Sequence, residues 1–110
     1  MQRDKVYLID ILEAAKLVRE YIGNKDKEDF LKDTQRQDAV VRRFAIIGEA
    51  SRRISDKMKA AYPDVAWNEM IGMRNAIIHE YDDIDMVIVW DTAKKDIPAL
   101  IYTIEKVLNY

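Results

Sequence analysis

The chain has 110 residues, of which 49% are apolar and 35% are charged, which predicts one folded domain, residues 1–110, with a single hydrophobic core. It has no cysteine and one histidine, which excludes disulfides and thiolate metal sites and argues against a zinc site. The net charge of −2 provides no overall attraction to nucleic acid, so contact with RNA would have to come from a local patch.

The N-terminal segment MQRDKVYLIDILEAAKLVREY interrupts its apolar residues with charges and lacks the core of a signal peptide. No apolar run approaches the roughly 20 residues that cross a bilayer, so we expect a cytoplasmic protein with no membrane partner. Apolar residues recur every three or four positions, which predicts a helix that ends at Gly23 and Asn24. Its stripe comprises Leu8, Ile11, Leu12, Ala15, Val18 and Ile22.

The charged connector at residues 24–33 is predicted to hold one short helical turn. Thr34 and Gln37 have the spacing of a capping box, so a second long helix is expected to begin at Thr34 and to end before Pro63. Within it, Gly48 leaves room for a neighbouring backbone to come close. Its apolar stripe comprises Val40, Phe44, Ile47, Ile54 and Met58.

Asp64 is expected to cap a third helix over about residues 65–80, and Asp83 or Asp85 a fourth. Pro98 lies inside the fourth helix, so we expect a bend or a restart just before it. The fold class predicted from these segments is all-α, an up-and-down bundle of four long helices plus a short helical turn. The apolar residues of the fourth helix include Val87, Trp90, Ile97, Ile101, Ile104 and Leu108.

The third helix has a basic residue on its predicted apolar stripe. Arg74 stands at a stripe position, and a guanidinium there costs free energy unless it is paired or faces a cleft. We therefore expect either a functional cleft or an ion pair with Asp82, Asp83 or a glutamate of another helix. His79 lies about 140° around the helix from Arg74, so the two flank one broad side. The other stripe residues are Trp67, Ile71, Ile78 and Tyr81.

The segment RNAIIHEY places Arg74, His79 and Tyr81 in the pattern Arg-x4-His-x-Tyr. This pattern resembles the signature of HEPN domains, and its flanks are similar to the HepT-like branch of that family. The resemblance covers the whole chain and implies a HEPN-like bundle. The flanking matches are IGEA at positions 47–50, Trp67, Ile71, Asp85 and Trp90.

The resemblance implies a metal-independent endoribonuclease that needs no cofactor and takes RNA, not DNA, as its substrate. In such enzymes the 2′-hydroxyl attacks the adjacent phosphate. His79 would then act as acid or base, Arg74 would bind phosphate oxygens, and Asn75 would donate a supporting hydrogen bond. One histidine cannot easily stand on both sides of an in-line displacement. We therefore expect a homodimer, or a higher even oligomer, with its cleft between copies.

In HepT-like toxins of type II toxin–antitoxin pairs, a minimal nucleotidyltransferase antitoxin attaches AMP to the motif tyrosine, a role that the resemblance assigns to Tyr81. AMP beside Arg74 would block the phosphate site by charge and bulk. The alternative hypothesis is a non-catalytic HEPN subunit that binds nucleotide or positions a nucleotidyltransferase, with the motif used only for contact.

From Arg36 to Lys59 the sequence has seven basic and three acidic residues, a net charge of +4 on the predicted second helix. RNA binding needs positive surface, so this helix is the candidate face for the RNA backbone, and a solvated face is the alternative. The acidic run from Glu80 to Asp85 would repel RNA locally. The candidate RNA contacts are Arg42, Arg43, Arg52 and Arg53.

Overall fold

The computed structural model describes residues 2–110, and these form six α-helices and one 3-10 turn. Four of the helices are long, and the short helix α2 lies where one helical turn is predicted, which confirms the all-α bundle. The elements are α1 (Gln2–Ile22), α2 (Lys27–Lys32), α3 (Thr34–Arg53), α4 (Asp56–Ala61), α5 (Trp67–His79), η1 (Tyr81–Asp83) and α6 (Met86–Leu108).

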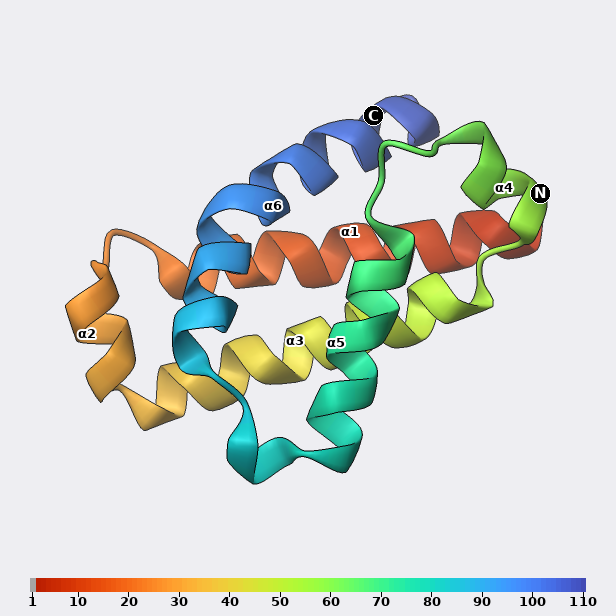
Figure 1. Cartoon of the computed structure of the whole chain (residues 1–110). Coiled ribbons are helices and arrows are strands. Elements are labelled where there is room, and N and C mark those ends of the chain that lie inside the picture. Colours follow the sequence, from red (N-terminus) through yellow and green to blue (C-terminus); the bar gives the residue numbers. More distant parts are fainter. Residues whose placement is uncertain (1) are drawn as a thin grey trace.

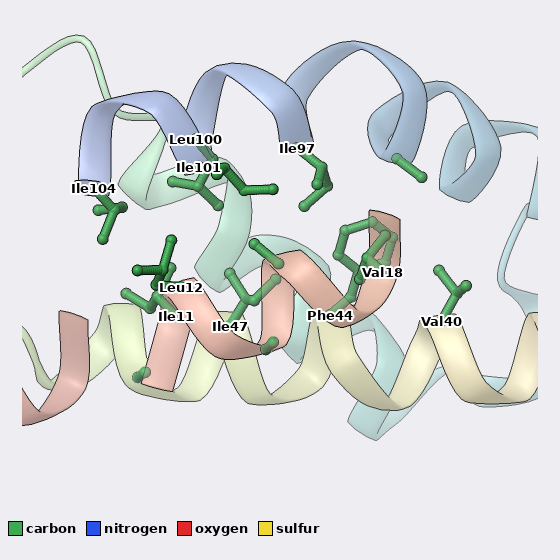
Figure 2. Close-up of a cluster of buried hydrophobic side chains, with 14 of the residues drawn as sticks. Ile11, Leu12, Val18, Val40, Phe44, Ile47, Ile97, Leu100, Ile101 and Ile104 are labelled. Carbon is green, nitrogen blue, oxygen red and sulfur yellow. The ribbon is translucent and has the colours of Figure 1, made fainter. Parts of the chain in front are cut away.

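Helices α1 and α3 form the centre of the molecule and run in opposite directions (Figure 1). Helix α6 packs on α1, and α5 packs on α3. Figure 2 shows α1 between α3 and α6, with apolar side chains of the three helices pointing toward one another. The predicted stripe of α1 is buried along its whole length, and both tryptophans are in the core. The labelled core residues are Ile11, Leu12, Val18, Val40, Phe44, Ile47, Ile97, Leu100, Ile101 and Ile104.

The predicted second helix is interrupted, and this part of the prediction was wrong. Helix α3 ends at Arg53, Ile54 is extended, and Ser55 begins α4 by accepting a hydrogen bond from the Met58 N–H at 3.1 Å. Asp4 of α1 accepts hydrogen bonds from the backbone N–H of Ser55 at 2.8 Å and from its hydroxyl at 2.7 Å. These contacts satisfy polar groups that the break exposes, and sequence periodicity carries no record of them.

Three predictions about helix starts can be compared with the structure. Asp33, not Thr34, caps α3 by accepting from the backbone N–H of Arg36 at 3.0 Å. Asp64 does not cap α5, which begins at Trp67 without a side-chain cap. Asp85 caps α6 as predicted, by accepting from the Val87 N–H at 2.9 Å.

Two special residues shape the ends and the course of the helices. Gly23, with a φ of +53°, ends α1 at the predicted position. Pro98 lies within one continuous helix, so α6 does not restart, but its axis changes direction part-way along in Figure 1. The bend accommodates the proline ring and the hydrogen bond that proline cannot donate.

Helix α5 crosses α3 at Gly48, and the two backbones lie very close there. A Cβ added to Gly48 would lie 2.2 Å from the Cβ of Arg74 and 2.5 Å from the carbonyl oxygen of Met70. Helix α5 packs less closely on α6 than on α3. A hollow of about 180 Å³ is lined by residues of α3, α5 and α6. Within the described residues, no helix is both long and apolar enough to cross a membrane.

Candidate functional site

Helix α5 turns a different face to the core from the stripe predicted for it. Trp67 and Ile77 are buried, whereas Ile78 is 52% exposed and Tyr81 is 49% exposed. The C-terminal half of the predicted stripe was therefore wrong. The helix ends at His79, so Tyr81 lies in η1 and is no longer in helical register with the residues before it.

Arg74 points from α5 toward α3, and its side chain is 22% exposed. Its Nη2 pairs with Oε1 of Glu49 at 3.1 Å, and its Nη1 donates a hydrogen bond to Oδ1 of Asn75 at 2.8 Å. The expected pairing with a glutamate of another helix is confirmed, and Asp82 and Asp83 are exposed. Because the Asn75 oxygen accepts from Arg74, its amide N–H groups are the part of that side chain that could donate to a substrate.

Glu49 gathers three guanidinium groups. It pairs with Arg52 at 3.1 Å and with Arg53 at 2.8 Å, both on α3, in addition to Arg74. Hydrogen bonds from Arg52 and Arg53, with the charges of Arg52 and Arg74, lower the pKa of Glu49 to about 2. One carboxylate shared by three guanidiniums leaves a local excess of positive charge, which is the electrostatic requirement for binding a phosphate.

A groove of about 390 Å³ runs between α1, α3 and α5. Its charged lining is three arginines, Arg42, Arg53 and Arg74, and the carboxylates of Asp10 and Glu49. Tyr7 of α1 lines it too, and hydrogen bonding by Arg53 and by Arg3 lowers the pKa of the Tyr7 hydroxyl. The structure thus brings two of the predicted RNA-backbone residues together with the motif arginine. Ile78, the residue before His79, also lines the groove.

The other basic residues of the predicted patch are arranged differently. Arg43 and Arg52 do not line this groove, and Arg43 has a buried Nε without a hydrogen-bond partner among the described residues. Arg36 pairs with Asp33 and donates to the backbone carbonyl of Tyr21, so it secures the start of α3. The predicted net charge of +4 is also divided between two helices, because the last two lysines of that patch lie on α4.

His79 is the last residue of α5, and its side chain is exposed. It does not line the arginine groove, which agrees with the expected separation of about 140° from Arg74 around the helix. Within one chain, the imidazole and the guanidinium therefore flank the C-terminal part of α5. They do not share one pocket.

The side chain of Tyr81 connects η1 to α3 through a hydrogen bond. Its hydroxyl donates a hydrogen bond to Oδ1 of Asp38 at 2.9 Å. That hydrogen bond, partial burial and the charges of Asp38 and Asp82 raise the pKa of Tyr81. Tyr81, the residue that the resemblance assigns to AMP attachment, is thus half-exposed, and a carboxylate accepts the proton of its hydroxyl.

The sequence of the chain was compared with those of known protein families. The family model described as "Ribonuclease HepT-like" matches residues 11–107, a range that contains the whole Arg-x4-His-x-Tyr motif and all three groove arginines. The chain belongs to the HepT-like ribonuclease family.

Two curated relatives show how far the similarity of this HepT-like chain extends. A protein of Thermococcus cleftensis named "Probable ribonuclease HepT" is 44% identical over 93% of each chain. A "Putative RNase" of Methanocaldococcus jannaschii is 41% identical over 87% of this chain and 88% of its own length. No solved structure was found to match this chain.

Sequence reasoning gave no individual role to three residues of this HepT-like site. Glu49 has a detectable signal, because arginines follow it at the helical spacings of three and four, but nothing local links it to Arg74. Asp38 and Tyr7 reach the site only through the tertiary fold. Among residues 2–110, no three His, Cys, Asp or Glu side chains gather as ligands for one metal ion.

Proposed function

We propose that this protein is a cytoplasmic, metal-independent endoribonuclease toxin that cuts RNA at a cleft formed across a homodimer. The proposal rests on the groove that Arg42, Arg53 and Arg74 line together. Glu49 pairs with Arg74 there, and His79 lies at the end of α5, the helix that carries Arg74. Membership in a ribonuclease family supports RNA as the substrate.

The residues present match the needs of cleavage by the 2′-hydroxyl. A base removes the 2′ proton, the 2′ oxygen attacks the adjacent phosphorus, and an acid protonates the leaving 5′ oxygen, which yields a 2′,3′-cyclic phosphate and a 5′-hydroxyl. His79 is assigned the acid or base step, because histidine exchanges protons near neutral pH. Arg74 is assigned the charge that develops on phosphorus, with the Asn75 amide as a supporting donor.

The placement of His79 favours an assembly of two chains. The sequence has one histidine, and its exposed side chain lies outside the arginine groove of its own chain. Two facing copies would supply two imidazoles, one for each side of the displacement. We therefore propose a homodimer or a higher even oligomer as the active form, and an inactive monomer.

We further propose that a minimal nucleotidyltransferase antitoxin silences the enzyme by attaching AMP to Tyr81. Tyr81 is 49% exposed, so the residue lies at the surface, where a modifying enzyme could contact it. The added phosphodiester would place a negative charge and a bulky nucleoside close to the motif, where both oppose the entry of RNA.

The test is cleavage of total RNA in EDTA by purified protein whose intact mass shows no added AMP. Wild type is compared with His79→Ala and with Asn68→Ala, a matched control that changes an exposed residue of the same helix. We expect cleavage by wild type and by Asn68→Ala, and its loss in His79→Ala at equal folded, dimeric concentration.

Two results would contradict the proposal. Equal cleavage by wild type and His79→Ala would remove His79 from the chemistry and indicate a contaminating nuclease. No cleavage by unmodified, dimeric wild type across several RNA classes would favour the non-catalytic subunit that binds nucleotide or positions a nucleotidyltransferase.

A further inference from the structure

The end of α5 that carries His79 is poorly held by apolar packing. Ile77 is the last buried residue of the helix, and residues 78–83 are all exposed. Backbone hydrogen bonds continue into η1, from the Glu80 N–H to the Ala76 carbonyl at 2.7 Å and from the Asp83 N–H to the Glu80 carbonyl at 2.8 Å. These bonds are local, so they shape the segment without fixing it to the rest of the molecule.

A long-range side-chain hydrogen bond links this segment to the exposed face of α3, and Ile84, the residue after η1, packs against the core. Tyr81 donates its hydroxyl proton to Asp38 at 2.9 Å, and the two residues are 43 positions apart in the chain. Asp38 lies on α3, the same helix that pairs with Arg74 through Glu49. A hydrogen bond to an ionised carboxylate is roughly twice as strong as one between neutral groups.

We infer that Asp38 is a positioning residue, whose hydrogen bond with Tyr81 holds the C-terminal end of α5, and with it His79, against α3. This inference rests on the proposed ribonuclease function and names a control point within it. Asp38 binds Tyr81, Tyr81 is the first residue of η1, and only Glu80 separates η1 from His79 along the chain.

The same contact explains how modification of Tyr81 would act at a distance from the groove. When the hydroxyl oxygen attacks the α-phosphorus of a nucleoside triphosphate, its proton is released to solvent and pyrophosphate departs. The esterified oxygen has no hydrogen left to donate, and the new phosphodiester charge repels the Asp38 carboxylate. Attachment of AMP therefore releases the segment that contains His79 in addition to obstructing RNA.

Hydrogen–deuterium exchange of the amides of residues 80–84 tests the contact directly. Tyr81→Phe removes the donor, Asp38→Ala removes the acceptor, and Asp38→Asn keeps an acceptor oxygen. We expect exchange about tenfold faster in Tyr81→Phe and Asp38→Ala, with Asp38→Asn between these variants and wild type, because it keeps the acceptor but loses the charge. The double variant Asp38→Ala/Tyr81→Phe should be no faster than either single variant, because both remove one interaction.

RNA cleavage by the same variants tests the positioning role. We expect kcat to fall in Tyr81→Phe and Asp38→Ala with little change in KM, because the arginine groove is intact, and to recover in part in Asp38→Asn. Unchanged exchange at residues 80–84 would overturn the inference, as would faster exchange with undiminished kcat. If wild type cuts no RNA, the ribonuclease proposal fails by itself, and the exchange comparison still decides whether the contact holds the segment. Peptides from α1 report whether any variant is globally unfolded.

Discussion

The Cβ of Arg74 occupies the space that any side chain at position 48 would need. A Cβ on Gly48 would lie 2.2 Å from it, far inside the van der Waals contact distance. This contact between two helices sets how closely the motif arginine approaches Glu49, the residue after Gly48.

Gly48→Ala should therefore displace α5, even though alanine is the better helix former by about 1 kcal/mol. The new methyl group would meet the Met70 carbonyl oxygen at 2.5 Å, and a backbone atom can move only if the helix moves. We expect a loss of about 1–3 kcal/mol in the free energy of unfolding and a large loss of RNA cleavage. Urea denaturation and an EDTA cleavage assay measure the two effects.

Gly72→Ala is the matched control on the facing helix. A Cβ at Gly72 would meet no atom within 4 Å, so the propensity gain should appear alone, as about 0.5–1 kcal/mol of added stability. Similar destabilisation by the two substitutions would show that close packing at Gly48 is not what limits the approach of α5.

Ser55→Ala should cost about 1–2 kcal/mol, because it removes the cap of α4 and the hydroxyl that donates to Asp4. Thermal unfolding measures the effect. Thr34→Ala is the control, since Thr34 has the sequence pattern of a cap but Asp33 performs the role. A shift in Tm with Thr34→Ala as large as with Ser55→Ala would contradict this account.

Glu49→Gln should make stability less sensitive to acid. The ionised form of Glu49 is favoured in the folded state, where its pKa is about 2, against an ordinary value of 4.5. The resulting stabilisation is fully present above about pH 4.5 and is lost as the pH falls toward 2. We expect the variant to be less stable than wild type at pH 7 and to lose less stability between pH 4.5 and 2.

Urea titrations over that pH range measure the difference. Glu13→Gln, which removes an exposed carboxylate of α1, is the control. Asp4 and Asp33 contribute in the same direction to wild type and to both variants. Burial alone would raise the pKa of Asp4, but hydrogen bonds from Ser55 outweigh it, and the backbone N–H of Arg36 lowers the pKa of Asp33. Parallel pH curves for wild type and Glu49→Gln would refute the prediction.

Arg42→Gln should weaken RNA binding and reduce its dependence on salt. If Arg42 contacts one phosphate in the groove, its loss lowers the slope of log K against log salt by about 0.7 for single-stranded RNA. Fluorescence anisotropy in a His79→Ala background measures binding without cleavage. Arg19→Gln removes an exposed charge from α1 outside the groove, so an equal change in slope there would indicate general electrostatics instead of a groove contact.

The parts of the fold that sequence predicted are those governed by neighbours along the chain. The buried stripe of α1, the stop at Gly23 and the cap at Asp85 follow from helical spacing and local hydrogen bonds. The break at Ile54 was missed because the apolar spacing continues through it into α4. What allows the break is Asp4, a residue 50 positions earlier.

The residues of the candidate site also fall into those with a local sequence signal and those that come together only in the tertiary fold. The unusual position of Arg74 was visible, because one charge on an apolar helix face is a local signal. Its partner Glu49 could be anticipated only as some glutamate on another helix, and Asp38 had no signal, since its link to Tyr81 exists only after α3 and η1 come together. The exposure of Ile78 was missed because periodicity placed Ile78 on the buried stripe, whereas the structure buries Ile77 and packs Arg74 against Gly48.

Helix α5 rests mainly on α3, beside a hollow that α6 does not fill, and it buries only Trp67 and Ile77, whereas α1, α3 and α6 provide most of the apolar core. A helix with one main neighbour can detach at a lower free-energy cost than the core needs to melt. We therefore expect two transitions on heating, the loss of activity at the lower temperature and the unfolding of the core at the higher one. Catalytic turnover would disappear first, at temperatures where circular dichroism still records a largely helical chain, and it would return on cooling.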